Sequence, residues 1–323
     1  MQVFKYVIKR LLMMVPVVLG TILILYLMMM AVAGDPAELI LGENASQEQY
    51  DELREDLGLN DPILVRYGKY VWDIVSKGDF GNSWYTSKPV AEGILERFPT
   101  TAGLASCGIF IMIVIGIPIG VISAIKQYTW VDNLAVSLGM VGVSMPNFWL
   151  GLELIIIFAL KLGWLPASGF YGPAYWILPG ITVGINSAAT VMRTTRSSVL
   201  ECVRQDYVRT ARAKGQSEQK VVVHHVLRNA LIPILTVIGM QFGIALGGAV
   251  VVETIFSIPG LGKYIVDAIG KRDFPIVLGG VVLLAICFSV VNLVVDLLYA
   301  IVDPRMRTQF QGGKKKKKEA KAA

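Results

Sequence analysis

The chain contains few charged residues and few of the side chains that most enzymes use. Charged residues make up 17% of its 323 positions, whereas hydrophobic residues make up 54%, and there are only two histidines and three cysteines. Because a water-soluble domain needs a polar shell, this composition excludes an ordinary soluble protein. The cysteines, at positions 107, 202 and 287, lie far apart, which indicates neither a disulfide framework nor a zinc site.

Motifs for nucleotide and acyl chemistry are also missing. The sequence has no G-x-x-x-x-G-K-[ST] segment to hold the phosphates of ATP, so we expect no ATP chemistry of that kind in this chain. It has no G-x-S-x-G segment either, which argues against an intramembrane hydrolase. The two histidines, His224 and His225, are neighbours that would point about 100° apart on a helix. We therefore expect them to have a structural or docking role, and no metal site.

Long uncharged runs are what the sequence has instead. A helix that crosses about 30 Å of hydrocarbon needs about 20 residues. Six runs supply such helices, with the fourth helix starting near Trp176: residues 11–33, 98–125, 134–160, 162–192, 229–252 and 274–302. The sequence therefore predicts an all-α polytopic membrane protein with six transmembrane helices. The "AVAG" at 31–34 looks like a signal-peptidase site, but a 23-residue run exceeds the usual apolar length of roughly 7 to 15 residues, so we expect helix 1 to be retained.

Loop charge predicts the orientation. Residues 34–100 contain 13 acidic and 6 basic residues, whereas residues 193–228 contain 8 basic and 3 acidic ones. Since cytoplasmic loops are enriched in Lys and Arg, both termini and the 193–228 loop should be cytoplasmic and the 34–100 loop extracytoplasmic. The tail, 303–323, includes five lysines at 314–318. We expect it to be a solvated basic cytoplasmic segment with some attraction to anionic headgroups.

One charged stretch, "DYVRTARAKGQSEQK" at 206–220, interrupts the apolar runs. At 100° per residue, apolar side chains share one face of a helix over 199–214 and polar ones share another. The apolar face holds Leu200, Val203, Tyr207 and Ala211, and the polar face holds Gln205, Arg209 and Arg212. Gly215 suits a left-handed helix end, and Ser217 suits the cap of a second short helix. An interfacial helix with its arginines on lipid phosphates would also explain the pattern.

Several strings together identify a family resemblance that spans nearly the whole chain. They are "GDP" at 34–36, "SMPNFW" at 144–149, "YVRTARAKG" at 207–215, "HVLRNALIP" at 225–233, "ETIFSIPGLG" at 253–262, "RDFP" at 272–275 and "VDLLYAIVDPR" at 295–305. The chain resembles the inner permease subunits of bacterial ATP-binding cassette importers, in the dipeptide, oligopeptide and nickel branch. The superfamily loop pattern has Glu where this chain has Arg209 and Pro where it has Arg228, and both departures match the branch's own version.

The resemblance implies a translocation subunit of the bacterial cytoplasmic membrane that couples ATPase motion to alternating access. It implies a permease core at 98–302 whose cytoplasmic coupling loop, 199–228, binds two ATP-binding cassette ATPases. Its other implied partners are a second homologous permease, an extracytoplasmic substrate-binding protein and membrane lipid, but no nucleic acid. ATP-Mg would be bound by the ATPases, with no cofactor in this chain. The implied coupling residues are Tyr207, Arg209, Thr210, Ala211, Arg212, Ala213, Lys214, Gly215, His225, Leu227 and Arg228.

Glu153 is an acidic residue inside the third uncharged run. An intramembrane carboxylate is costly, so it should face a cavity, a partner or the substrate pathway. The alternative is a structural role, either paired at the interface between two permeases or near the outer headgroups, since Lys161 is only eight residues further on. The branch accommodates peptides, nickel chelates and small glycans, of which peptides are the first expectation. A membrane scaffold without transport activity is a rival hypothesis, which an associated pair of ATPases would exclude.

Overall fold

The computed structural model describes residues 2–31, 35–42 and 45–302, so the predicted basic tail at 303–323 lies outside the described residues. Within those residues every regular element is helical, apart from one isolated bridge between Asn82 and Pro89. The chain divides into two compact units. One comprises residues 1–9, 102–258 and 290–323, and the other comprises residues 10–101 and 259–289. The all-α prediction is therefore confirmed for the part of the chain that the structure describes.

Four helices are long and apolar enough to cross a membrane, and a bent helix pair raises the number to five. The four single spans are Val7–Met29, Val90–Ile125, Glu218–Ile255 and Phe274–Leu297, and they correspond to four of the six predicted runs. The run at 162–192 forms most of α8 (Ile177–Val203), a helix that also contains Arg193, Arg196 and Glu201 and is not among these candidates.

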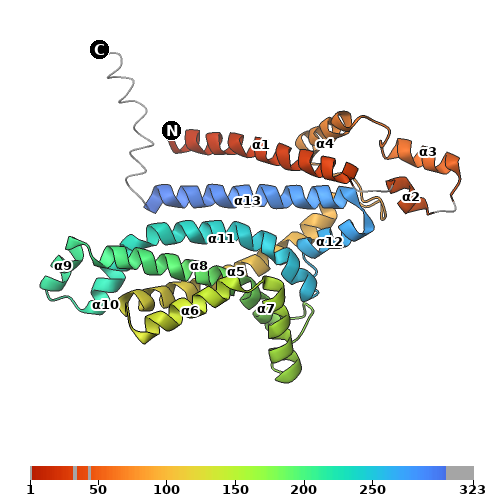
Figure 1. Ribbon diagram of the computed structural model, residues 1–323. Helices are drawn as coiled ribbons and strands as arrows, with labels where there is room; N and C mark the ends of the chain where they lie inside the picture. Colours follow the sequence, from red (N-terminus) through yellow and green to blue (C-terminus); the bar gives the residue numbers. More distant parts are fainter. Residues whose placement is uncertain (1, 32–34, 43–44, 303–323) are drawn as a thin grey trace, which may run out of the picture. The chain divides into compact units, whose positions relative to one another are not determined.

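The third run is not one straight helix. It forms α6 (Trp130–Ser144) and a second helix, Asn147–Lys161, that bends away from it by 105° (Figure 1). The second helix consists of α7 (Asn147–Leu154) and a π-helical end, Ile155–Lys161. The break follows from Pro146, because the residue before a proline is driven out of the helical region. Met145 accordingly has φ −79° and ψ 122°.

In the first unit, α5 (Val90–Ile125) approaches α8 through glycines. A Cβ atom on Gly120 would lie 2.6 Å from the carbonyl oxygen of Met192, and one on Gly116 would lie 2.8 Å from that of Ala188. Gly184 on α8 is equally close to the backbone of Gly108 on α5, at 2.7 Å. These glycines thus allow the backbones of α5 and α8 to approach closely, as small residues do in membrane proteins.

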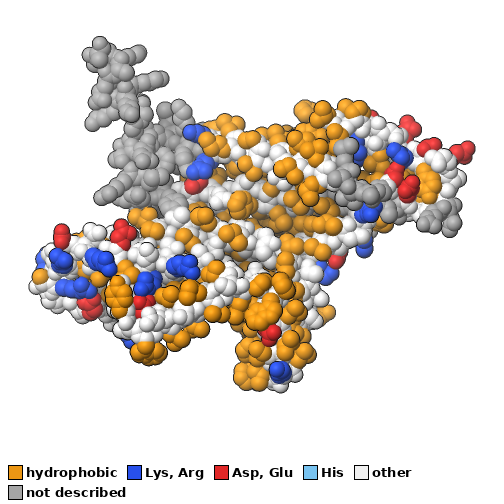
Figure 2. All heavy atoms as spheres, in the orientation of Figure 1, with side chains coloured by type: hydrophobic (Ala, Val, Ile, Leu, Met, Phe, Trp, Pro, Cys, Tyr) orange, Lys and Arg blue, Asp and Glu red, His pale blue; other side chains and the backbone are white. Residues whose placement is uncertain are grey.

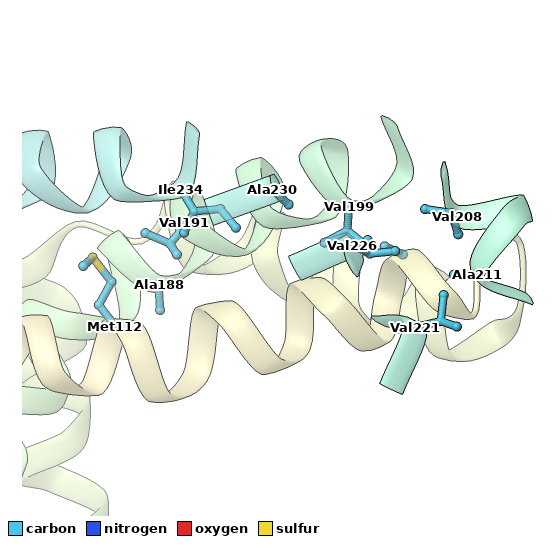
Figure 3. Packing of buried hydrophobic residues seen from close by; sticks show 11 residues of the cluster. Met112, Ala188, Val191, Val199, Val208, Ala211, Val221, Val226, Ala230 and Ile234 are labelled. Carbon is cyan, nitrogen blue, oxygen red and sulfur yellow. The ribbon is translucent and has the colours of Figure 1, made fainter. Parts of the chain in front are cut away.

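A single apolar cluster joins the cytoplasmic-loop candidate to the long helices (Figure 3). It includes residues of α5, α8, α9 (Asp206–Ala213) and the continuous helical segment formed by α10 (Glu218–Lys220), a π-helical turn (Val221–Leu227) and α11 (Arg228–Ile255). Val191, Val199, Val208, Val221 and Val226 are each fully buried in it. α8 and α11 also pack along each other, so the charged stretch is packed against the same apolar core as the long helices.

The second unit contains most of α1 (Gln2–Ala31) together with α2 (Pro36–Leu41), α3 (Gln47–Asp56), α4 (Ile63–Lys77), α12 (Leu261–Lys271) and the first part of α13 (Phe274–Val302). The predicted 34–100 loop is therefore largely helical. The segment just before α5 is held in place by the buried Asp273. The Asp273 carboxylate accepts hydrogen bonds from the Ser83 hydroxyl at 2.5 Å and the Trp84 amide at 3.2 Å.

Candidate coupling segment

The predicted helix over 199–214 is wrong, because two helices share these residues. α8 continues to Val203, and α9 begins at Asp206. Between them Gln205 is extended, with φ −77° and ψ 151°. Asp206 in the first turn favours a helix start there, because a carboxylate stabilises the positive end of the helix dipole. Leu200 and Val203 accordingly belong to α8.

The break also changes which face of α9 is buried. Val208 is 0% exposed and Ala211 is 6% exposed, and both belong to the cluster that contains Val221 (Figure 3). Tyr207, which the periodicity placed beside Ala211, is 40% exposed. The prediction assumed one continuous helix through α8 and α9. The extended backbone at Gln205 rotates α9 relative to that helix, so a different set of side chains is buried.

The glycine corner is confirmed. Gly215 has φ +74°, its amide donates to the carbonyl of Arg212 at 2.9 Å, and the next amide, that of Gln216, donates to the carbonyl of Ala211 at 3.4 Å. A Cβ atom on Gly215 would meet nothing within 4 Å. The backbone conformation alone therefore favours glycine at this position.

The helix that follows the corner is long, which corrects the prediction of a second short helix. Ser217 occupies the cap position with φ −60° and ψ 143°, although its side chain makes no capping hydrogen bond. From Glu218 the helical segment continues to Ile255 as one 38-residue candidate span. The corner is thus connected directly to a membrane helix.

Two side-chain contacts brace the corner. The Arg212 guanidinium forms a salt bridge with Glu218 across the glycine, with Nε 3.0 Å from Oε2 and a second hydrogen bond from Nη2 to Oε1. Nε2 of His225 lies 2.8 Å from Oε1 of Gln216. The sequence analysis included Arg212 and His225 but missed Gln216 and Glu218, because only the fold around Gly215 shows which residues face each other.

The remaining predicted coupling residues separate into a surface and a core. Arg209, Thr210, Ala213, Lys214 and Arg228 are exposed, whereas Leu227 packs against the apolar cluster with Ala211. Within the described residues neither Arg209 nor Lys214 forms a salt bridge. Figure 2 shows Lys and Arg side chains gathered over α9 and α10. This surface can accept an acidic partner without first breaking an internal ion pair.

An ion pair between α6 and α8, supported by a hydroxyl from α5, was missed by the sequence analysis. Asp132 on α6 is 2% exposed and accepts hydrogen bonds from Nε and Nη2 of Arg196 on α8, both at 2.8 Å. The Ser123 hydroxyl on α5 donates to the same carboxylate at 2.5 Å, and the Tyr128 amide does so at 3.0 Å. All four contacts satisfy a charge that would otherwise be costly to bury.

Glu153 lies on α7, beyond the helix break, and is half-buried. It forms no salt bridge with Lys161 among the described residues. The break itself contains polar groups, because the Asn186 side chain donates to the Met145 carbonyl at 3.2 Å and Oδ1 of Asn147 is buried without a hydrogen-bond partner. Broken helices with polar groups at membrane depth are where transporters place substrate and ion sites.

Comparison with known proteins agrees with this architecture. Residues 116–308 match the family model described as "Binding-protein-dependent transport system inner membrane component". Residues 3–105 match the model of the N-terminal part of the corresponding membrane component. Together the two matches include α1, α9 and α11.

The chain is similar to curated proteins over nearly its full length. A dipeptide transport system permease protein of Alkalihalophilus pseudofirmus is 42% identical, over 94% of this chain and 99% of that protein. A glutathione transport system permease protein of Salmonella paratyphi A is 41% identical over the same shares. In fold, the chain is similar to a chain of an inward-facing methionine ABC transporter, with a TM-score of 0.57, 18% identity, and coverage of 68% of this chain and 100% of that one.

Proposed function

Because the chain belongs to the family of binding-protein-dependent transport system inner membrane components, we propose that it is the translocation-pore subunit of an ATP-driven importer for peptides or related small solutes. The chain is a multi-pass protein of the bacterial inner membrane. Its relatives are permeases for a dipeptide and for glutathione, which supports a peptide substrate. Binding-protein-dependent transport requires an ATPase and a substrate-binding protein as partners.

The observation that carries the proposal is the connection between α9 and the long helix Glu218–Ile255. Arg209 on α9 and Lys214 just after it are exposed cations that form no salt bridge within the described residues, the buried face of α9 is part of the apolar cluster, and the corner at Gly215 is braced by two side-chain contacts. A docked element of this kind transmits the motion of a partner because it cannot move independently of its base. We assign the contact with two cytoplasmic ATPases to Arg209, Thr210, Ala213, Lys214 and Arg228, with Tyr207 at its edge, and the support of that contact to Ala211, Arg212, Gly215, His225 and Leu227.

The proposed topology has six spans and both termini in the cytoplasm. The spans are α1, α5, the bent α6–α7 pair, α8, the helix 218–255 and α13. The charge difference between residues 34–100 and 193–228 supports this orientation. A second homologous permease would complete the pore, the substrate-binding protein would deliver solute to the 34–100 side, and ATP-Mg would be bound by the ATPases. Within the pore we assign Glu153 to the substrate pathway.

Charge reversal at Arg209 tests the coupling assignment. Arg209→Glu should release most of the ATPase from the affinity-purified permease complex and strongly lower peptide uptake in reconstituted vesicles. The difference from the parent should shrink at higher salt, because screening weakens the new repulsion as well as the lost attraction. Arg193→Glu is the matched control, since Arg193 is also exposed but lies on α8. If Arg209→Glu retains its ATPases and transports at the parent rate, α9 is not the ATPase contact.

A further inference from the structure

Helix α4 has three distinct faces. The first, formed by Ile63, Tyr67, Tyr70, Val71 and Ile74, packs in the cluster around Ile22 and Tyr26 of α1. At 100° per residue these five side chains occupy one sector of about 100°, which accounts for less than a third of the helix.

The second face is apolar and exposed. Leu64 is 70% exposed, Val65 44%, Trp72 68% and Val75 77%. They occupy the sector next to the packed face. Such a row of large apolar side chains on the surface marks a contact with a partner or a membrane. In Figure 2 hydrophobic side chains are dense over α4 and continue onto α1.

The third face is charged. It includes Arg66, Lys69, Asp73 and Lys77, three basic residues and one acidic one. These residues occupy a third sector, centred about 130° from the exposed apolar face. Lys69 forms a salt bridge with Asp61 and Lys77 forms one with Asp73, so this side of α4 faces water and headgroup-like polar groups rather than hydrocarbon.

The contacts of α4 fix its depth along α1. The Tyr67 hydroxyl donates to the carbonyl of Leu19 at 3.3 Å, and the Tyr67 and Tyr70 rings lie 6.2 and 5.8 Å from that of Tyr26. Leu19 is ten residues before Met29, where the candidate span ends, and ten residues correspond to about 15 Å of helix. Half of a bilayer's hydrocarbon core has this thickness. The packed face of α4 therefore lies against the part of α1 that one leaflet covers.

We propose that α4 is an interfacial membrane helix, and that Leu64, Val65, Trp72 and Val75 insert into the acyl chains of the leaflet next to the Met29 end of α1. The exposed apolar face then continues the lipid-facing surface of α1, on which Ile24, Leu27 and Met28 are each more than half exposed. The basic face, about 130° around the helix, is directed toward lipid phosphates and water, and Trp72 occupies the boundary region that tryptophan prefers. By this assignment α4 lies at the membrane surface, unlike the rest of the acidic 34–100 segment.

Site-specific photocrosslinking tests the proposal. A diazirine amino acid is placed at Leu64 or Val75 on the exposed apolar face, and at Lys69 or Lys77 on the charged face as matched controls. The full chain is reconstituted, with the subunits that co-purify with it, in vesicles of phosphatidylethanolamine and phosphatidylglycerol. After irradiation, mass spectrometry identifies the adducts on the fraction that elutes as intact complex. We expect phospholipid adducts at positions 64 and 75, at a yield several-fold above that at positions 69 and 77.

Two results would overturn the proposal. If positions 64 and 75 crosslink to a protein subunit instead of phospholipid, the exposed face is a protein interface. If all four positions give equal and low phospholipid yields, α4 lies in water. Since none of these positions belongs to the coupling segment, the result does not depend on the proposed transport function.

Discussion

Arg196 binds Asp132 through two parallel hydrogen bonds of 2.8 Å, and this pair connects α8 to α6. Ser123 adds α5 to the same carboxylate. Such a forked contact fixes the orientation of both side chains, because guanidinium and carboxylate are both planar. The position of α8, which leads into the coupling segment, is thus set by charge as well as by apolar packing.

Removing the Asp132 charge should destabilise the protein. Asp132→Asn leaves Arg196 largely desolvated without its counter-ion, and breaking a buried pair costs roughly 3 to 5 kcal/mol. We expect the lower end, about 3 kcal/mol, because the Arg196 side chain keeps 25% exposure. Thermal unfolding of the purified complex measures the effect. The double variant Asp132→Leu with Arg196→Met serves as control, and a double variant as unstable as the single one would show that the loss is not due to an unpaired charge.

Substitution of Gly215 should separate backbone strain from steric clash. Gly215→Val places a β-branched residue at φ +74°, which costs about 1 to 2 kcal/mol, whereas asparagine tolerates this conformation better. Since a Cβ atom there meets nothing within 4 Å, both variants should insert normally. We expect Gly215→Val to lower ATPase stimulation by substrate-loaded binding protein, with Gly215→Asn close to the parent. Equal activity of both variants would mean that the corner's conformation does not matter for coupling.

Neutralising Glu153 should change transport rather than assembly. Because the residue is half-buried and makes no salt bridge with Lys161, Glu153→Gln should leave the yield of assembled complex unchanged. If it lines the pathway, the substitution should alter the uptake ratio between cationic and anionic peptides, measured in reconstituted vesicles. Loss of assembled complex with an unchanged ratio would instead assign Glu153 to a structural contact.

Cysteine accessibility tests the proposed orientation. Glu52 on α3 and Ser217 at the corner are both exposed, so cysteines there should be reactive on whichever side they lie. In intact cells with the outer membrane permeabilised, an impermeant thiol reagent should label Glu52→Cys and not Ser217→Cys, with the parent's three cysteines as background. In inverted membrane vesicles the pattern should reverse. Labelling of both positions in intact cells would contradict the six-span topology.

The sequence predicted four of the six spans at nearly the observed positions, because uncharged runs leave a membrane helix few alternatives. The prediction for the third run rested on its lack of charge, which does not indicate whether a helix is straight, and it did not use Pro146. The bend after Ser144 was therefore not predicted. The phase error at Tyr207 has a related cause. A single extended residue, Gln205, restarts the helical periodicity, and local propensity does not require that residue to be extended.

Tertiary contacts account for the other residues that the sequence analysis missed. Asp132 and Arg196 are 64 positions apart, so their pairing depends on how α6 and α8 pack. Glu218 meets Arg212 only because the chain reverses at Gly215. The proposed coupling residues come from the family resemblance, and the fold shows which of them are exposed and which are packed against the apolar cluster.

The glycines between α5 and α8 have a consequence for the gene. Every missense change of one base in a glycine codon adds a Cβ atom. At Gly116, Gly120 and Gly184 that atom would lie within 2.8 Å of a backbone oxygen, whereas at Gly247 it would meet nothing within 4 Å. No single-base missense change at Gly116, Gly120 or Gly184 therefore preserves the α5–α8 contact. Spontaneous mutants selected for resistance to a toxic peptide should carry substitutions at these three codons far more often than at the codon of Gly247.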